Sequence, residues 1–179
     1  PVFLAQAGIH SGEIDGKDAG MMLLRDIAFG TKKSLLDKVN FLFIPILSVD
    51  AHERSSEYNR PNQRGPEKQG WRTNAQNLNL NRDYAKLDTK EIRAVVQVMN
   101  EFNPTFYMDI HVTDGADYQY DITFGGVGIQ GISTGIEEWL ETVYKPAADK
   151  DLTASGHIPG QLLFALNEFP VLDSYFGRY

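Results

Sequence analysis

The sequence predicts an α/β fold built on a mixed, largely parallel and twisted sheet that is flanked by helices. Short apolar runs typical of buried strands alternate along the chain with segments of helical periodicity. A hydrophobic fraction of 42% among 179 residues is ample for a core. Open sheets of this class bind ligands at the carboxyl ends of their strands, so reactive side chains at those positions are candidates for a site.

The N-terminal part of the chain is predicted to form a strand, a helix and a second strand. Residues 2–9 are mostly apolar, as in a buried strand. Residues 18–29 have apolar side chains at three- and four-residue steps, and Gly30 stands where this helix would end. Residues 41–47 predict the second strand, in which Pro45 is unusual for a central position.

A long polar segment, residues 48–83, shows little periodicity. Such a segment inside a compact domain is usually functional or disordered. Residues 88–102 then predict the clearest helix, with Asp88 and Glu91 as a capping pair. The predicted buried stripe of this helix is Ile92, Val95, Val96, Met99 and Phe102.

The remaining elements are a strand over residues 105–111, a strand over residues 118–124 and a helix over residues 136–148, which follows a glycine-rich stretch, residues 125–135. Side chains alternate across a strand, which places three polar residues of the first of these strands on one face: Tyr107, Asp109 and His111.

Composition excludes several classes of function. A net charge of −7 argues against a nucleic-acid partner, and no segment approaches the roughly 18 apolar residues of a membrane span. The absence of cysteine excludes disulfides, thiolate nucleophiles and cysteine zinc sites. Because Pro1 immediately precedes a strand and residues 174–179 read as a loop, we expect a piece of a longer protein. The compartment stays open between secreted or periplasmic and cytoplasmic.

Two short motifs, about a hundred residues apart, carry the strongest functional signal. The segment His10-Ser11-Gly12-Glu13 follows the first predicted strand, and Asp109-Ile110-His111 ends the strand over residues 105–111. Two imidazoles and one carboxylate suit a catalytic zinc, which keeps a fourth position for water. His10, Glu13 and His111 are therefore predicted to bind one Zn²⁺ ion for metal-assisted hydrolysis. The alternative is a loop histidine with a surface glutamate, because an isolated His-x-x-Glu is weak evidence.

The other two histidines, His52 in a charged run and His157 in a predicted turn, have no spaced partner that resembles a ligand set. Two arginines of the polar segment are stronger candidates. Arg82 is flanked by amides and an aromatic residue, which predicts that it is less solvated than most, and arginine with asparagine suits a carboxylate. An arginine beside a metal, such as Arg72, can stabilise an oxyanion.

The order of these motifs resembles the zinc metallocarboxypeptidases of the carboxypeptidase A type, over residues 2–125. The shared order is His-x-x-Glu, Trp-Arg, Asn-Arg and a strand-terminal histidine. The resemblance implies a phosphorylase/hydrolase-like fold and a single, partial catalytic domain over residues 1–179, with a sheet incomplete at its ends. It implies zinc ligands at His10, Glu13 and His111, and a carbonyl-polarising arginine at Arg72. It also implies that Asn81 and Arg82 hold the terminal carboxylate of the substrate.

The sequence departs from the family pattern in three places. The family often has Asn-Pro-Asp-Gly where residues 48–51 read Ser-Val-Asp-Ala, and an aspartate that supports a zinc-bound histidine is replaced by Asn79, a weaker acceptor. The general-base glutamate of the family is expected beyond the end of this chain, and Glu168 does not match its context. The substrate-closing tyrosine has only two weak candidates, Tyr175 and Tyr179.

Three functions therefore stay open. The favoured one is hydrolysis of a C-terminal peptide bond by metal-activated water, on a substrate with a free carboxylate. The second is an N-acyl amino acid deacylase of the aspartoacylase or succinylglutamate desuccinylase kind, which Gly8-Ile9-His10 and Asp109-Ile110-His111 fit almost as well. The third is a zinc-containing, non-catalytic peptide-binding module, because the general base is unassigned.

Overall fold

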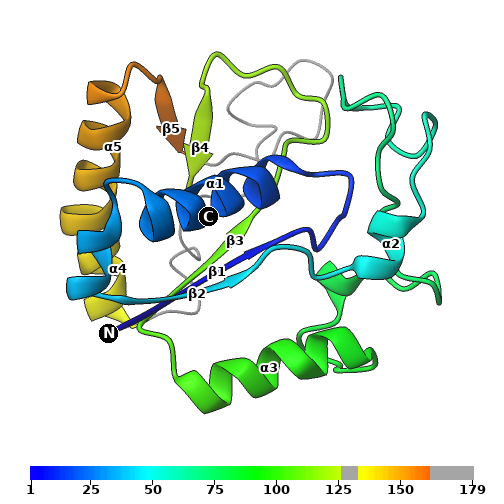
Figure 1. Cartoon of the computed structure of the whole chain (residues 1–179), viewed down its shortest axis with the longest axis horizontal. Helices are drawn as coiled ribbons and strands as arrows, with labels where there is room; N and C mark the ends of the chain where they lie inside the picture. The colour runs from blue at the N-terminus through cyan, green and yellow to red at the C-terminus, as the bar shows by residue number, and fades with distance from the viewer. Residues whose placement is uncertain (126–132, 162–179) are drawn as a thin grey trace. The chain divides into compact units, whose positions relative to one another are not determined.

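The computed structural model describes residues 1–125 and 133–161, which fall into two compact units (Figure 1). The first unit is Pro1–Ala116, and the second begins at Asp117. Within these described ranges, each helix is too short or too polar to traverse a bilayer.

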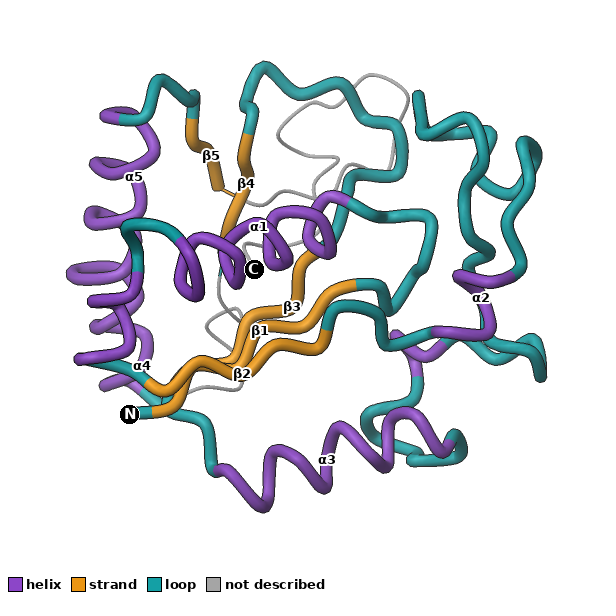
Figure 2. The backbone as a smooth tube through the Cα atoms, in the orientation of Figure 1, coloured by secondary structure: helices purple, strands orange, loops and turns teal. Residues whose placement is uncertain are grey.

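The first unit is organised around three parallel strands, β1 (Val2–Ala7), β2 (Asn40–Ile44) and β3 (Phe106–Ile110). Their order in the sheet is β2-β1-β3, so Ala5 of the central strand pairs with Phe43 on one side and Met108 on the other (Figure 2). The predicted parallel α/β arrangement is confirmed. The chain leaves β1 first toward β2 and later returns to β3, and ligands bind at such a reversal of strand order.

Helix α1 (Asp15–Phe29) covers one face of this sheet. A Cβ atom on Gly20 would lie 2.1 Å from the ring of Phe43, so the missing side chain lets the helix backbone approach β2 closely. The helix begins three residues before the predicted start at Asp18. Asp15 and Asp18 both lie in its first turn, where their charges favour the helix dipole.

Helix α3 (Lys90–Phe102) lies on the opposite side of the strands in Figure 1. Ile92 and Val95 are buried in a cluster that includes Leu80 and Ile9, which confirms the centre of the predicted stripe. Phe102 is 44% exposed, so the stripe was predicted one turn too long.

The predicted capping pair of α3, Asp88 with Glu91, is wrong. Thr89 is the N-cap, and its hydroxyl oxygen accepts a hydrogen bond from the backbone N–H of Ile92 at 3.4 Å. Thr89 is held in turn by Asp83, whose carboxylate accepts from both the backbone N–H and the hydroxyl of Thr89. A carboxylate six residues earlier in the chain therefore starts this helix, which the spacing of a capping box does not anticipate.

The polar segment, residues 48–83, is largely irregular, as predicted. It contains a short helix, α2 (Val49–Glu53), and a single 3₁₀ turn, η2 (Leu80–Arg82), while another 3₁₀ turn, η1 (Lys33–Asp37), precedes β2. β2 ends at Ile44, earlier than predicted, because Pro45 has no N–H to continue the pairing. A bridge between Ser56 and Gln69 folds the middle of the segment back on itself.

The second unit contains two parallel strands, β4 (Ile122–Phe124) and β5 (Pro159–Gln161). Only the end of the strand predicted over residues 118–124 is formed. The predicted helix is longer than expected and runs through α4 (Thr134–Trp139), a π-helical turn η3 (Leu140–Tyr144) and α5 (Lys145–Ala154). Pro146 stands in the first turn of α5, where its missing N–H is tolerated once the π-helical turn has widened the backbone.

Candidate metal centre

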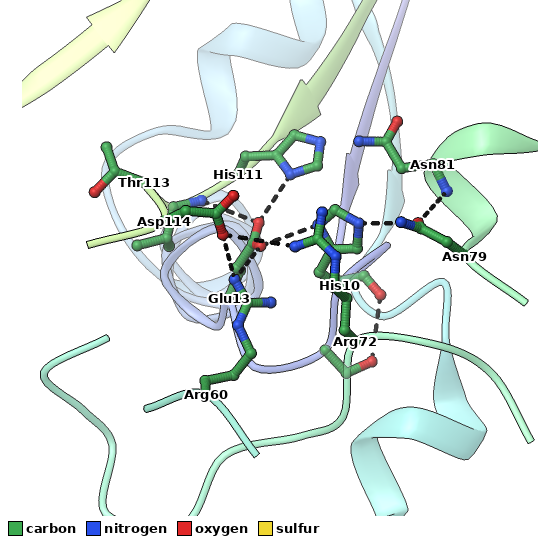
Figure 3. A network of polar contacts seen from close by, with 12 residues as sticks. His10, Glu13, Arg60, Arg72, Asn79, Asn81, His111, Thr113 and Asp114 are labelled. Atoms are coloured by element: carbon green, nitrogen blue, oxygen red, sulfur yellow. Dashed lines mark hydrogen bonds and ion pairs between the residues drawn. The ribbon is translucent and has the colours of Figure 1, made fainter. Parts of the chain in front are cut away.

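The three predicted metal ligands come together at the carboxyl ends of β1 and β3. His10 and Glu13 follow β1, and His111 follows β3 directly. One potential ligand atom from each residue lies within 4.8 Å of the others (Figure 3). Among the described residues, this is the group of histidine and acidic side chains whose spacing suits a metal ion. Neighbouring parallel strands thus bring together motifs that the sequence separates widely.

The turn that carries His10 and Glu13 is hydrogen-bonded to the backbone of Ser48, which follows β2. Gly8 adopts a left-handed conformation with φ of 67°, and its carbonyl accepts a hydrogen bond from the backbone N–H of Ser48 at 2.9 Å. The hydroxyl of Ser11 donates to the carbonyl oxygen of Ser48 at 2.5 Å. The N–H of Glu13 closes the turn on the carbonyl oxygen of His10 at 3.0 Å. These hydrogen bonds hold the loop after β1 against the segment that follows β2.

Glu13 is the centre of the cluster. Its Oε1 lies 3.0 Å from Nδ1 of His10, and its Oε2 lies 2.8 Å from Nδ1 of His111. The Glu13 carboxylate is almost completely buried, which opposes its ionisation. The hydrogen bonds from the two imidazoles outweigh this desolvation and hold the pKa of Glu13 well below its usual range. The site therefore presents a carboxylate anion between two histidine nitrogens.

Each histidine points its other ring nitrogen at a side-chain oxygen. Nε2 of His10 lies 3.1 Å from Oδ1 of Asn79, and Nε2 of His111 lies 3.0 Å from Oδ2 of Asp109. Metal-binding histidines commonly donate the N–H of their second nitrogen to such an acceptor, which fixes the ring. Nδ1 is therefore the nitrogen that both residues offer to a metal. Asn79 occupies the place expected for the supporting acceptor.

His111 is the more accessible of the two histidines, with a side chain 34% exposed. Partial burial lowers its pKa, but the hydrogen bonds to Asp109 and Glu13 have the larger combined effect and raise the pKa of His111 to about 10. The residues fit a zinc ion by their donor chemistry, because two imidazole nitrogens and a carboxylate converge on one point.

A partly buried polar network holds Asp109 through Gln6, its pairing partner on β1. The side-chain amide of Gln6 donates to Oδ1 of Asp109 at 3.1 Å and to the hydroxyl of Tyr84 at 3.0 Å. The hydroxyls of Tyr84 and Tyr107 lie 2.9 Å apart. Burial raises the pKa of both phenols, so they remain neutral hydrogen-bonding groups. The prediction that Tyr107, Asp109 and His111 share one face of the strand is confirmed by these contacts.

Arg60 is a central member of the cluster that the sequence did not reveal. Its side chain is 3% exposed, and its Nη2 donates to Oε1 of Glu13 at 2.9 Å and to Oδ1 of Asp114 at 2.9 Å. No local pattern distinguishes Arg60 from Arg54 or Arg64, which lie in the same polar run. Arg60 lies in the part of this run that is closed by the bridge between Ser56 and Gln69.

The structure gives each of the other predicted site residues a different partner. Nη1 of Arg72 lies 3.5 Å from Oδ1 of Asp114, and its side chain is 36% exposed beside the cluster. The backbone N–H of Asn81 donates to Oδ1 of Asn79, the oxygen that also faces His10. Arg82 is exposed, and its Nη1 donates to the carbonyl of Asn81 at 2.6 Å. The expectation that Arg82 is shielded from solvent is therefore wrong.

The remaining candidates lie outside this cluster. His52 is beside Glu53 at 3.3 Å, and Nδ1 of His157 is 3.9 Å from Asp121, so neither joins a ligand set among the described residues. Glu168, Tyr175, Tyr179 and most of the glycine-rich stretch lie outside the described residues.

Comparison with known proteins gives a consistent picture. A family model for zinc carboxypeptidases matches residues 1–148. A comparison with curated proteins gave no match. The solved structures that resemble the chain include two that carry the description "putative": a carboxypeptidase A from Shewanella denitrificans and a carboxypeptidase from Burkholderia mallei. Another is a metallo-carboxypeptidase from Burkholderia cenocepacia.

The Shewanella protein is 27% identical, with a TM-score of 0.60, and the match covers 78% of this chain and 35% of that one. The Burkholderia cenocepacia protein is 23% identical with a TM-score of 0.52, covering 65% and 30%. The Burkholderia mallei protein is 18% identical with a TM-score of 0.64, covering 94% and 40%. The two Burkholderia structures share the fold with this chain. The chain thus spans between 30% and 40% of the length of these three proteins.

Proposed function

The chain belongs to the zinc carboxypeptidase family, and on this premise we propose that it acts in a zinc-dependent metallocarboxypeptidase that hydrolyses a C-terminal peptide bond with metal-activated water. The observation that carries the proposal is the convergence of Nδ1 of His10, Nδ1 of His111 and the carboxylate of Glu13 at the ends of two adjacent strands. In this proposal, residues 1–179 contribute to one catalytic domain. The family match supports this, because it runs across both compact units.

We assign one zinc ion to His10, Glu13 and His111. A zinc ion held there would polarise the scissile carbonyl and activate a water molecule for attack. Asn79 and Asp109 orient the two imidazoles from behind, so that the ligand nitrogens already face the same point. This preorganisation reduces the conformational entropy that must be lost when the metal binds.

Arg72 has the proposed role of stabilising the oxyanion that forms on the substrate carbonyl. Its guanidinium stands beside the cluster, is partly exposed and is tied to Asp114 at 3.5 Å. A cation fixed where negative charge develops favours the transition state over the bound substrate. Asn81 and Arg82 are proposed to hold the terminal carboxylate, and the exposure of Arg82 leaves it accessible to a substrate. The substrate class is therefore a peptide with a free C-terminus.

Metal analysis of the purified protein tests the ligand assignment. We expect one equivalent of zinc, and we expect it to be lost when His10, Glu13 and His111 are all replaced by alanine. Replacing His52 and His157 by alanine is the matched control, because those histidines lie outside the cluster. Full zinc content in the triple variant would refute the assignment.

A substrate comparison separates peptidase from deacylase activity. We expect the zinc-loaded enzyme to cleave an N-blocked dipeptide with a free carboxylate faster than an N-acyl amino acid. The reverse preference would favour the deacylase. Zinc binding with no turnover of either substrate would favour the non-catalytic binding module.

A further inference from the structure

We propose that Arg60 is a positioning residue of the metal centre, which fixes the carboxylate of Glu13 in the orientation that a metal ion requires. This inference rests on the proposed zinc site. Arg60 contacts neither a predicted ligand nitrogen nor the proposed substrate residues Asn81 and Arg82. It acts through Glu13, to which its Nη2 donates at 2.9 Å.

The donors around Glu13 divide into two pairs. One pair is Nδ1 of His10 and Nδ1 of His111, which contact different carboxylate oxygens. The other pair is Nη2 of Arg60 on Oε1 and the backbone N–H of Val112 on Oε2, at 2.9 and 3.2 Å. A histidine that binds a metal through Nδ1 must lose the proton on that nitrogen, so it no longer donates to Glu13.

Arg60 and Val112 are then the donors in the described structure that still hold the carboxylate. Each carboxylate oxygen has two lone-pair sites, and one donor on each oxygen leaves the second site free. The free sites face the histidines, because that is where the imidazole contacts lie in this structure. Arg60 therefore fixes the side of Glu13 that the backbone of Val112 does not reach.

A purely stabilising role explains Arg60 less well. Among the described residues, its Nη1 is buried without a hydrogen-bond partner, whereas buried polar groups are normally satisfied. Buried ion pairs often contribute little net stability, because the desolvation of two charges offsets their attraction. Arg60 also packs closely against Gly12. A Cβ atom at position 12 would lie 2.8 Å from Cγ of Arg60 and 2.9 Å from the carbonyl oxygen of Gly70, so a larger residue there would displace the arginine or the backbone.

The positive guanidinium of Arg60 would also repel a Zn²⁺ ion. The proposal therefore requires that its orienting effect on Glu13 raises zinc affinity by more than this repulsion lowers it. Asp114 lies 2.9 Å from the same Nη2 and balances part of the positive charge. Loss of a residue that orients a metal ligand typically weakens metal binding about 10- to 100-fold. We therefore infer that orientation outweighs repulsion and that Arg60 strengthens zinc binding.

The test is zinc affinity, measured by competition with a chromogenic chelator at constant pH. Arg60→Met keeps the length of the side chain and removes its charge and donors, and we expect about 10- to 100-fold weaker binding. Arg60→Lys keeps the charge but has no planar fork, so we expect an intermediate loss. Arg25→Met is the matched control, because Arg25 is exposed on α1 and pairs with its neighbour Asp26, and we expect no change.

A spectroscopic measurement distinguishes positioning from general destabilisation. With Co²⁺ in place of zinc, we expect the visible absorption bands of Arg60→Met to differ from those of the unmodified protein and those of Arg25→Met to match them. If Arg60→Met does not fold, the affinity of Arg60→Lys gives the answer. Zinc affinity that is unchanged or tighter in the Arg60 variants overturns the proposal. Failure of the unmodified protein to bind zinc would instead refute the proposed function, and this inference with it.

Discussion

Oδ1 of Asp114 lies 3.5 Å from Nη1 of Arg72, which ties the proposed carbonyl-polarising arginine to the loop that follows His111. The same oxygen accepts a hydrogen bond from Arg60, so one carboxylate is shared by two guanidinium groups. Arg72 belongs to the long polar segment, but Asp114 connects it through Arg60 to Glu13 of the candidate metal centre. The role proposed for Arg72 would benefit from this contact, because a charge that is already in place needs less rearrangement when charge develops on a substrate.

The first prediction concerns Arg72. Arg72→Ala should lower kcat and kcat/KM together by about 10²- to 10³-fold, because it removes a contact made mainly in the transition state. Asp114→Asn should have the same direction but a smaller effect, at most about fivefold, because the Asp114 side chain is 64% exposed and exposed pairs are worth about 1 kcal/mol or less. Steady-state kinetics on a blocked dipeptide measures both. An Arg72→Ala variant that changes KM alone would contradict the role.

The second prediction concerns the terminal carboxylate. Arg82→Ala should raise KM about 10- to 100-fold for a dipeptide with a free carboxylate, since hydrogen bonds to charged groups contribute roughly 1.5–3 kcal/mol. The corresponding amidated dipeptide should be affected little by the same change. Arg93→Ala is the control, because Arg93 is exposed on α3 and donates to the backbone carbonyls of Leu87 and Asp88, just before the helix. Equal losses on the free and the amidated substrate would rule out carboxylate recognition by Arg82.

The third prediction concerns Leu80, the buried residue that anchors η2 in the core. Leu80 is fully buried in the cluster with Ile9 and Ile92, and it lies between Asn79 and Asn81. Leu80→Ala should lower the free energy of unfolding by about 2–5 kcal/mol, because it leaves a cavity in the core. Leu78→Ala, at a position 37% exposed, should cost much less. Urea unfolding of the metal-free variants measures the difference, and equal costs would show that η2 is not anchored by Leu80.

The fourth prediction concerns pH. Asp83 is buried and accepts hydrogen bonds from Thr89 and Asp88, and the hydroxyl of Thr89 has the largest part in lowering its pKa below the usual 3.8. A lowered native pKa means that ionised Asp83 stabilises the fold above pH 3.8 and that this stabilisation is lost as the pH falls through the native value.

The variant Asp83→Asn should therefore have a lower Tm than the unmodified protein at neutral pH, and the gap should narrow below about pH 4. Asp88→Asn is the control, since the carboxylate of Asp88 is 57% exposed and pairs with Lys86. Thermal unfolding followed across this pH range measures both variants. A gap that stays constant into acid would mean that the charge of Asp83 is unimportant for α3.

The sequence predicted the parts of the fold that local pattern determines. The strands that became β1 and β3 carry strong apolar runs, and the helical stripe of Ile92 and Val95 has the expected period, so their type was predicted correctly. The cap of α3 was missed because it depends on Asp83, a residue outside the helix motif. The π-helical turn before Pro146 was missed for a similar reason, since no local pattern in the sequence distinguishes it from the rest of the helix.

The metal site divides in the same way. His10, Glu13 and His111 follow strands β1 and β3, which are parallel neighbours. Their carboxyl ends therefore lie at the same edge of the sheet, and the structure brings the three side chains together. Arg60 and Asp114 lie in irregular loops, and only the folding of those loops over β1 and β3 gives them their contacts. Side chains whose partners are set by loop geometry leave no periodic signal in the sequence.

His111 and Glu13 are 98 positions apart in the chain. A metal ion that links them would act as a non-covalent clip across most of the first unit, closing a long loop that the unfolded chain must otherwise close at an entropic cost. Because such a preformed set of ligands is absent from an unfolded chain, each tenfold rise in free zinc above the dissociation constant would add about 1.4 kcal/mol to the stability of the folded form. The supply of metal in the surroundings would then set how long the protein survives as well as how fast it works.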